Sequence, residues 1–333
     1  MSLSVADIRA AAQRIQGRAV RTPFLFAPAA SKATGARVFI KAEVLQRTGS
    51  FKFRGAMSRL TLLTADELRR GVVAFSSGNH AQAVAAAARE LGTSAVIVMP
   101  ADAPALKISN TRGYGAEVVL YDRVKEDRVA IGKQLSRERG LVLVPPFDDY
   151  YVMAGQGTIG LEIAEDAGAL GVSPELVIVP CSGGGLAAGV ATALAGTMPG
   201  TRVVAAEPEN YDDLVRSLAA GARVGNAPGA LSICDALMSD KPGELTFPIL
   251  QSLHASAVAV SEAEVLAAMR HAFFELKLVA EPGGAAALAS VLSGKVDVRD
   301  KTIAVVLSGG NVDAAMFQRA LEAPGPRASS PAV

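Results

Sequence analysis

The feature that most constrains the fold is a regular alternation of short apolar runs with longer amphipathic segments. It begins with VVAF at Val72 and continues with SAVIVMP at Ser94, AEVVLY at Ala116 and LVLVP at Leu141. The segments between these runs have the composition and length typical of helices. Strands that are apolar throughout and alternate with helices form parallel sheets whose two faces are both covered. The pattern therefore predicts an α/β fold.

A second series of the same kind follows, so we expect two α/β lobes. Its expected elements are a helix over 153–167, the strand LVIVP, a helix from 186, the strand RVVAAE, a helix from 212 and the strand TIAVVLS. A length of 333 residues also favours two domains. We predict a large domain over 1–48 and 149–321, a small domain over 49–148 and a disordered tail over 322–333.

Composition excludes several classes of partner. Basic and acidic residues number 33 and 32, so net charge indicates neither a nucleic acid nor an anionic membrane. The two cysteines, Cys181 and Cys234, form no disulfide framework or zinc-binding spacing. The start, MSLSVADIRA, lacks the pattern of a signal peptide, and no apolar run suggests a membrane span. We therefore expect a cytoplasmic protein.

Three of the predicted strands end in unusual loops. VVAF is followed by SSGNH over 76–80, LVIVP by CSGGGLAAG over 181–189, and TIAVVLS by GGN over 309–311. In open parallel sheets, ligands bind beyond the carboxyl ends of the strands. These loops are therefore the candidate binding segments. Standing alone, SSGNH would be interpreted as an ordinary helix cap by Ser76 or Ser77, and Ser308 before the third loop could likewise be a helix cap.

The glycine-rich loop predicts a phosphate site. Gly183, Gly184 and Gly185 lie between a strand and a helix, where glycine lets the backbone approach an anion and the helix start offers free N–H groups. Ser182 adds a hydroxyl. A flexible turn is the ordinary alternative. The spacing of Gly183, Gly185 and Ala188, with Glu207 about 20 residues later, also fits a nicotinamide-dinucleotide site.

The loop SSGNH offers hydroxyls, an amide and a helix start together, which suits a carboxylate or a ring hydroxyl. The dinucleotide interpretation leaves this loop unexplained. It also leaves Lys52, in GSFKFRGA, unexplained, although most lysines are simply solvated charges. A phosphate-only interpretation leaves both segments available for other chemistry.

Seven segments together resemble those of the fold type II pyridoxal-phosphate enzymes, specifically the serine/threonine dehydratase (threonine ammonia-lyase) and serine racemase group. In order along roughly 5–320 they are GSFKFRGA, SSGNHAQAVA, AGQGTIGLEI, SGGGLAAG, AAEPENYDD, EPGGAAAL and LSGGN. The resemblance implies a tryptophan synthase β-like fold, with two open, twisted, mostly parallel sheets flanked by helices. The small domain is inserted in the large one.

The resemblance also implies a set of cofactor contacts for pyridoxal 5'-phosphate. Lys52 would form the Schiff base, Phe51 would pack on the ring, and Asn79 would hydrogen-bond the ring hydroxyl. Ser308 would meet the pyridine nitrogen, which suits β-elimination better than transamination because a hydroxyl cannot hold that nitrogen protonated. The phosphate would be held by Ser182, Gly183, Gly184, Gly185 and Leu186.

The substrate contacts that the resemblance implies lie in one loop. The substrate carboxylate would meet Ser76, Ser77, Gly78, Asn79 and His80. Ser77 also matches the position of the second base of serine racemase, so its presence leaves racemase activity open. Arg54 is interpreted differently, as a structural cation at a helix start.

The family further has a divalent cation site, whose positions match Glu207, the backbone carbonyl of Tyr211, and Asp213. Two carboxylates and a carbonyl suit a hard cation such as Mg²⁺ or Ca²⁺. This role competes with ribose binding by Glu207. A solvated acidic helix start is the ordinary alternative.

The function implied by the resemblance is dehydration and deamination of a β-hydroxy amino acid, such as threonine or serine, to a 2-oxo acid and ammonia. Departures from the family pattern at Pro145, Tyr150, Tyr151, Ala236 and Tyr211 keep a hydroxyaspartate or another substrate open. A homodimer is a family expectation, and a catabolic, unregulated enzyme fits a chain with no second domain after 320. A nicotinamide-dependent oxidoreductase and a non-catalytic phosphate-metabolite sensor are the alternatives from other classes.

Overall fold

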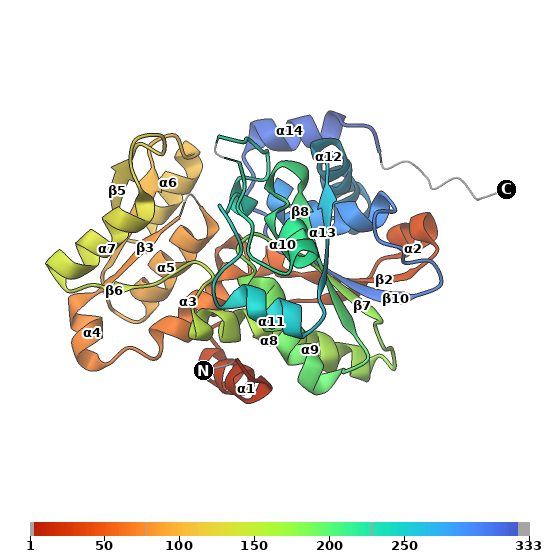
Figure 1. Cartoon of the computed structure of the whole chain (residues 1–333), viewed down its shortest axis with the longest axis horizontal. Coiled ribbons are helices and arrows are strands. Elements are labelled where there is room, and N and C mark those ends of the chain that lie inside the picture. The colour runs from red at the N-terminus through yellow and green to blue at the C-terminus, as the bar shows by residue number, and fades with distance from the viewer. Residues whose placement is uncertain (1–2, 77, 228, 326–333) are drawn as a thin grey trace.

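The computed structural model, shown in Figure 1, describes residues 3–76, 78–227 and 229–325. Its larger sheet has six strands. Their spatial order is β1-β2-β10-β7-β8-β9, with only β1 antiparallel to its neighbour. The bounds are β1 Phe24–Phe26, β2 Arg37–Ala42, β7 Leu176–Pro180, β8 Arg202–Pro208, β9 Ser256–Val260 and β10 Thr302–Leu307. The strands predicted for this sheet are confirmed, whereas β1, β2 and β9 were not predicted.

Both faces of this sheet are buried, which explains the unbroken apolar runs. Ile303, Val305 and Leu307 face one core, whereas Ala304 and Val306 face another. The first core is covered mainly by helices α12, Glu262–His271, and α13, Pro282–Leu292. The second is covered by α8, Tyr150–Ala169, and α9, Gly185–Thr197. Side chains that alternate between two cores are what a parallel sheet covered on both faces requires.

The smaller sheet is fully parallel and has the order β5-β4-β3-β6. Its strands are β3 Val72–Phe75, β4 Ala95–Pro100, β5 Glu117–Tyr121 and β6 Val142–Leu143. Helices α3, Lys52–Leu60, and α5, Asn79–Glu90, cover one face, and α7, Arg128–Arg139, covers the other. Helix α6, Ala105–Gly113, packs beside α5.

One predicted helix is shorter than expected. The segment between the apolar runs AEVVLY and LVLVP was expected to be helical, but α7 begins only at Arg128, after the cap residue Asp127. The Asp127 carboxylate accepts hydrogen bonds from the backbone N–H groups of Val129 and Ala130. Asp122 likewise accepts from the N–H of Val124, which folds 122–127 into a turn. Aspartate competes in this way with helical hydrogen bonding.

The remaining helices complete the two halves of the molecule, and the terminal helix reaches Glu322. They are α1 Val5–Ile15, α2 Pro28–Thr34, α4 Ala65–Arg70, α10 Asp213–Ala220, α11 Thr246–Ser252 and α14 Ala314–Glu322. Helix α1 starts with the capping box of Ser4 and Asp7. Cys181 and Cys234 are buried free thiols. Within the described residues no helix has the length and apolarity needed to cross a membrane.

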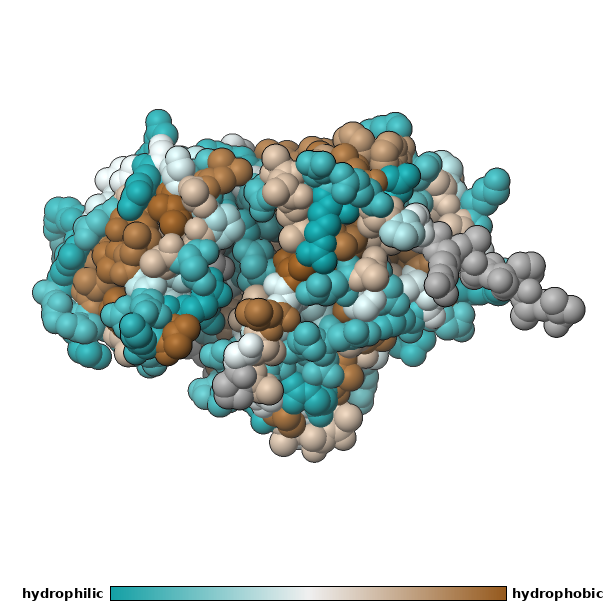
Figure 2. All heavy atoms as spheres, turned by 90° about the horizontal axis from the view of Figure 1, so that it is seen from above, coloured by the Kyte–Doolittle hydropathy of each residue, from teal (hydrophilic) through white to brown (hydrophobic). Residues whose placement is uncertain are grey.

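The two sheets occupy opposite ends of the molecule, and Figure 2 shows the surface hollowed between the two halves. The large sheet uses strands from residues 24–42 and 176–307, whereas the small sheet uses 72–143. This agrees with the inserted small domain, although the domain boundaries themselves stay a prediction. Most of the predicted tail, 326–333, lies outside the described residues.

Candidate active site

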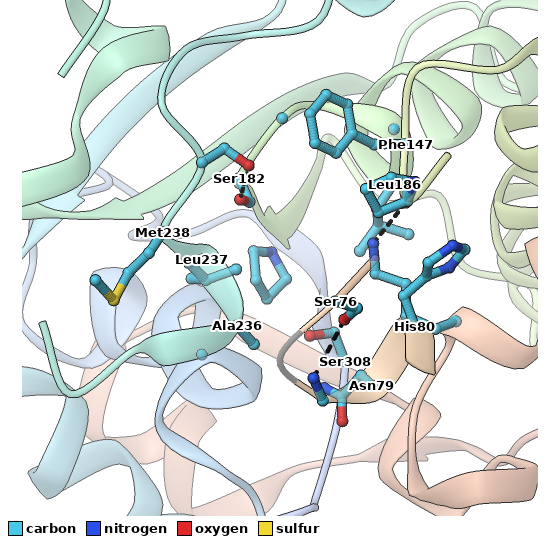
Figure 3. A pocket seen from close by; sticks show the side chains of 18 of the residues that line it. Ser76, Asn79, His80, Phe147, Ser182, Leu186, Ala236, Leu237, Met238 and Ser308 are labelled. Atoms are coloured by element: carbon cyan, nitrogen blue, oxygen red, sulfur yellow. Dashed lines mark hydrogen bonds between the residues drawn. The ribbon is translucent and has the colours of Figure 1, made fainter. Parts of the chain in front are cut away.

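A pocket that is partly open to solvent lies where strands of both sheets end. It is lined by the residues that follow β3 and β7, by Ser308 after β10, and by the start of α3. In open α/β sheets, ligands bind beyond the carboxyl ends of the strands. Residues of the first two loops singled out in the sequence, together with Ser308 just before the third loop, therefore meet in one pocket, shown in Figure 3.

Lys52 lies at the first position of α3, and its side chain lines the pocket. Its Nζ donates a hydrogen bond to the carbonyl oxygen of Pro146 at 2.8 Å and lies 5.1 Å from the centre of the Phe51 ring. Burial lowers the pKa of the Lys52 amine to about 8. A substantial fraction of the amine is therefore neutral just above neutral pH, as a nucleophile or a base requires.

The segment before Lys52 is joined to the end of the chain. Ser50 and Gly309 form an isolated antiparallel bridge, and the Phe51 N–H donates to the carbonyl oxygen of Ser308 at 3.0 Å. Ser308 is buried and lines the pocket. The residues expected to meet a pyridine ring from different sides, Phe51, Lys52 and Ser308, are therefore fixed to one another through the backbone.

The glycine-rich loop is packed so tightly that side chains are excluded. A Cβ atom on Gly183 would lie 2.3 Å from the Phe147 ring, and one on Gly184 would lie 2.7 Å from Thr246 Oγ1. Gly184 also has a φ of 93° and caps α9, which begins at Gly185. Bare backbone at the start of a long helix is the arrangement that binds phosphate. Leu186, the next residue, also lines the pocket.

Ser182 stands at the edge of this loop, and its Oγ lies 2.6 Å from the Oγ of Ser239. Ser239 and Phe147 are pocket residues that the sequence interpretation missed. Neither belongs to a recognised motif, and both approach the glycine loop from distant parts of the chain. Such residues carry no local signal.

The segment SSGNH contributes four described residues to the pocket, Ser76, Gly78, Asn79 and His80. Ser77 lies outside the described residues. Helix α5 is capped by Gly78, without a side-chain cap, and Ser76 Oγ instead accepts a hydrogen bond from the Gly78 N–H at 3.2 Å. The ordinary N-cap interpretation therefore does not account for Ser76.

His80 is held in its neutral form. Burial, assisted by the nearby charge of Lys52, lowers the pKa of His80 to about 3. Its Nε2 lies 2.9 Å from the Val144 carbonyl oxygen, which a neutral ring with a proton on Nε2 can satisfy as a donor. His80 can therefore offer a substrate carboxylate a neutral imidazole only, and its contact with substrate stays a prediction.

The three residues of the predicted cation site lie away from the pocket lining. Glu207 is fully buried, and its carboxylate accepts hydrogen bonds from the N–H groups of Leu214 and Val215. This placement gives no support to its alternative role as a ribose ligand. The Tyr211 hydroxyl donates to the Ala230 carbonyl oxygen, and Asp213 Oδ1 accepts from Asn226 Nδ2.

Two carboxylates buried near each other are electrostatically unfavourable. Burial, together with the Asp213 charge, raises the pKa of Glu207 well above its usual value, and burial raises the pKa of Asp213 to about 6. Within the described part of the chain, Asp213 Oδ2 is buried without a hydrogen-bond partner. Among the described residues no group of three or more His, Cys, Asp or Glu side chains could hold a metal ion, so a cation here would need backbone ligands.

Arg54 is a buried structural cation, as expected. Its guanidinium donates to Glu43 at 2.8 Å and to Glu162 at 2.6 Å. Lys41, also fully buried, pairs with Glu162 at 2.7 Å. These pairs join α3, which carries Lys52, to α8 and to the end of β2.

Comparison with known proteins identifies the class of enzyme that this pocket defines. Residues 15–309 match the family model described as "Pyridoxal-phosphate dependent enzyme". The L-threonine ammonia-lyase of Thermotoga maritima is 40% identical over 95% of this chain and 78% of its own length. The L-threo-3-hydroxyaspartate ammonia-lyase of a Pseudomonas species is 42% identical over 92% and 95%.

Solved structures agree with these relatives. Maize serine racemase superposes with a TM-score of 0.90 at 36% identity, covering 96% of this chain and 97% of its own. The chain therefore belongs to the family of pyridoxal-phosphate-dependent enzymes and has their type II fold. This confirms the resemblance noted in the sequence and the expected cofactor.

Proposed function

We propose that the protein removes water and ammonia from a β-hydroxy amino acid by pyridoxal-phosphate-dependent β-elimination. The observation that carries the proposal is the presence of Lys52 and the Gly183–Gly185 loop on the walls of one pocket. When bound, the cofactor supplies an electron-withdrawing ring conjugated to the α-carbon of the substrate. Neither alternative, a nicotinamide-dependent oxidoreductase or a phosphate-metabolite sensor, gives Lys52 a role.

The protein's own groups then have distinct tasks. Lys52, with its lowered pKa, can take the α-proton of the substrate and deliver it to the departing β-hydroxyl, which then leaves as water. The loop backbone would hold the cofactor phosphate, and the Ser308 hydroxyl would face the pyridine nitrogen as a weak hydrogen-bond partner that does not keep it protonated. Ser76 would orient the substrate carboxylate, and Asn79 would meet the ring hydroxyl of the cofactor. The unsaturated product reacts with water to form a 2-oxo acid and ammonia.

The decisive test compares the wild type with Lys52→Ala. After incubation with pyridoxal phosphate and gel filtration, we expect the wild type to be yellow and to release ammonia and a 2-oxo acid. The variant should show neither the visible band nor turnover. A colourless wild type that does not retain the cofactor would contradict the proposal.

One observation favours a substrate with a second carboxylate. Arg128 lines the pocket, and its guanidinium has no carboxylate within 4.0 Å among the described residues. A guanidinium binds a carboxylate through two parallel hydrogen bonds, in bidentate geometry. We therefore propose 3-hydroxyaspartate alongside serine and threonine as a substrate, in keeping with the Pseudomonas relative.

Release of 2-oxo acid from threonine, serine and 3-hydroxyaspartate, measured for the wild type and for Arg128→Gln, should separate these candidates. We expect the variant to lose roughly 100-fold in kcat/KM for hydroxyaspartate, about the value of a charge-assisted pair, while threonine turnover changes little. Arg123→Gln, at an exposed pair with Asp102, is the matched control. Equal losses on both substrates would exclude recognition of a side-chain carboxylate by Arg128.

We also propose that Ser77 acts as the base on the opposite ring face, so that slow racemisation accompanies elimination. Formation of D-serine from L-serine, monitored by chiral chromatography, tests the proposed racemisation. Ser77→Ala should abolish the D-isomer.

The cation proposal is supported by the unpartnered Asp213 Oδ2 and the raised pKa values of the two buried carboxylates. We propose that Glu207, Asp213 and the Tyr211 carbonyl hold Mg²⁺ or Ca²⁺. Chelation should lower Tm, and either cation should restore it. Asp213→Asn should be insensitive to both treatments.

We further propose a cytoplasmic homodimer. The free thiols Cys181 and Cys234 suit a reducing compartment. The exposed apolar side chains of Leu25 and Phe26, on the edge strand β1, suit a subunit contact. Light scattering of Phe26→Asp, which should be monomeric, tests the second point.

A further inference from the structure

A second lysine lies in the pocket, and the reaction as described leaves it unused. Lys107, on α6, is only 6% exposed, whereas lysines are almost never buried unless paired. Its Nζ donates to Asp235 Oδ2 at 2.7 Å and lies 3.7 Å from Glu281 Oε2. All three residues line the pocket.

The ion pairs of Lys107 connect the two halves of the molecule. Helix α6 packs with α5 and β5 beside the small sheet, on the left of Figure 1. Glu281 caps α13, which packs against β7, β8 and β10 of the large sheet. Lys107 also lies close over the substrate loop, because a Cβ atom on Gly78 would lie 2.8 Å from its Cδ.

Glu281 links Lys107 to Asn79. One carboxylate oxygen, Oε1, accepts a hydrogen bond from Asn79 Nδ2, while Oε2 faces Lys107. Asn79 Oδ1 in turn accepts from Asn311 Nδ2 at 2.8 Å. An amide has two N–H donors, so one donor of Asn79 remains for another acceptor. Glu281 and Asn311 together determine the direction in which this free N–H of Asn79 points.

The charge of Glu281 depends on its surroundings. Burial raises the pKa of Glu281, and the Lys107 ammonium opposes that rise. Burial alone would lower the pKa of Lys107, but Glu281 and Asp235 raise it. A protonated Glu281 would offer Asn79 a weaker acceptor, since hydrogen bonds to charged groups are about twice as strong as neutral ones.

We propose that Lys107 is a positioning residue for the elimination reaction: its ammonium keeps Glu281 ionised, and Glu281 in turn holds the Asn79 amide toward the cofactor ring. This inference rests on the proposed function, in which Asn79 meets the ring hydroxyl. The ion pairs also make the arrangement depend on α6 lying over the pocket, so the ring contact is tied to the relative position of the two halves.

The test uses holoenzyme with Lys107→Met, which removes the charge and keeps most of the stem, and Lys107→Arg, which retains the charge. Lys125→Met, at a lysine whose side chain is 80% exposed, is the matched control. Absorption spectra of the bound cofactor are recorded beside kcat and KM. We expect Lys107→Met to retain the cofactor, to shift its visible band and to lose about tenfold in kcat, while Lys107→Arg recovers most of both.

A double-mutant cycle with Glu281→Gln decides whether Lys107 acts through Glu281. The double variant Lys107→Met/Glu281→Gln should be no more impaired than Glu281→Gln alone. Asp235→Asn should retain the wild-type spectrum, because Lys107 still faces Glu281. Losses that multiply in the double variant, or an unchanged spectrum in Lys107→Met, would overturn the proposal.

The failure of the proposed function is distinguishable from these outcomes. It would appear in the wild type, as absence of cofactor uptake or of ammonia release. If Lys107→Met does not fold, Asp235→Asn and Glu281→Gln still decide the matter. Equal spectral changes in these two variants would overturn the role of Lys107.

Discussion

At the scale of single residues, the main feature is an amine held in a pocket where its charge is disfavoured. Lys52 lies beside the Phe51 ring and has a carbonyl oxygen, that of Pro146, as hydrogen-bond acceptor. Within the described residues, no carboxylate pairs with the Lys52 ammonium, so its charge is not compensated by a salt bridge. A reactive amine of this kind weakens the fold that contains it.

This cost predicts a specific pH dependence for the cofactor-free protein. The pKa of Lys52 is about 8 in the folded protein and 10.5 ordinarily, so the unfolded chain binds more protons between these pH values. The destabilisation caused by this site is therefore fully present below pH 8 and disappears as pH rises from about 8 to 10.5. Lys52→Met should be more stable than wild type by about 3 kcal/mol at pH 7.

Denaturant unfolding of the two cofactor-free proteins at several pH values measures this difference. It should shrink as pH approaches 10.5, whereas Lys125→Met should show no such trend. A difference that is constant with pH would mean that Lys52 gains its stability effect from packing, not from its charge.

The sequence predicted the residues whose chemistry depends on a local motif. Lys52 and Gly183–Gly185 were found because each lies in a short, distinctive segment at the end of a strand or the start of a helix. Lys107 and Glu281 were not assigned roles, because a lone charge on a helix or at its cap is usually solvated. Their partners lie 128 and 202 residues away along the chain, so no local pattern connects them.

At the scale of elements, helix α8 holds the lysine-bearing helix α3 through glycine contacts. A Cβ atom on Gly155 would lie 2.6 Å from the Arg54 carbonyl oxygen and from the Gly55 Cα. The sequence predicted α8 over 153–167, close to the observed Tyr150–Ala169, but not this role for its glycines. Close helix contacts depend on which faces meet, and that is decided by tertiary structure.

We predict that Gly155→Ala destabilises the protein by about 1–3 kcal/mol and displaces Lys52, because backbone atoms must move. Gly168→Ala, on the same helix, is the matched control, since a Cβ atom there meets nothing within 4 Å. The control should be neutral or stabilising by up to about 1 kcal/mol. Thermal unfolding and cofactor uptake measure both variants, and equal behaviour would contradict the packing argument.

The buried ion pairs of Arg54 fasten the same two helices. Removing one partner of a buried pair leaves an uncompensated charge, which costs about 3–5 kcal/mol. Arg54→Met should therefore be destabilised by about that amount, because Glu43 and Glu162 lose their shared partner. Arg139→Met, at an exposed pair with Glu117, should change stability by less than about 1 kcal/mol in the same urea titration.

At the scale of the whole molecule, the pocket draws its walls from both halves. The alternation of apolar runs was sufficient to predict two parallel sheets, because burial on both faces leaves a local signature. The order of the strands was not predicted, because pairing joins segments far apart in the chain. The edge strand β9, SAVAV, was missed because three of its five residues are only partly buried.

A ligand that contacts both halves should stabilise the whole fold. We predict that pyridoxal phosphate, at about 100 times its Kd, stabilises the cofactor-free protein by about 2.7 kcal/mol and raises Tm by several degrees. Pyridoxal without the phosphate should give a much smaller shift, since the glycine loop then has no anion to bind. Equal shifts by differential scanning calorimetry would show that the loop does not hold the phosphate.

The position of β10 has a consequence for how the protein is made. This strand, the last in the part of the chain that the structure describes, lies in the middle of the large sheet between β2 and β7, and the bridge at Gly309 holds the segment that precedes Lys52. During synthesis on the ribosome, β2 and β7 emerge first. Neither can pair with β10, which lies between them in the finished sheet, until residues 302–309 have been made. The large sheet and the active site must therefore close only after most of the chain has been synthesised, and every incomplete chain exposes unpaired strand edges.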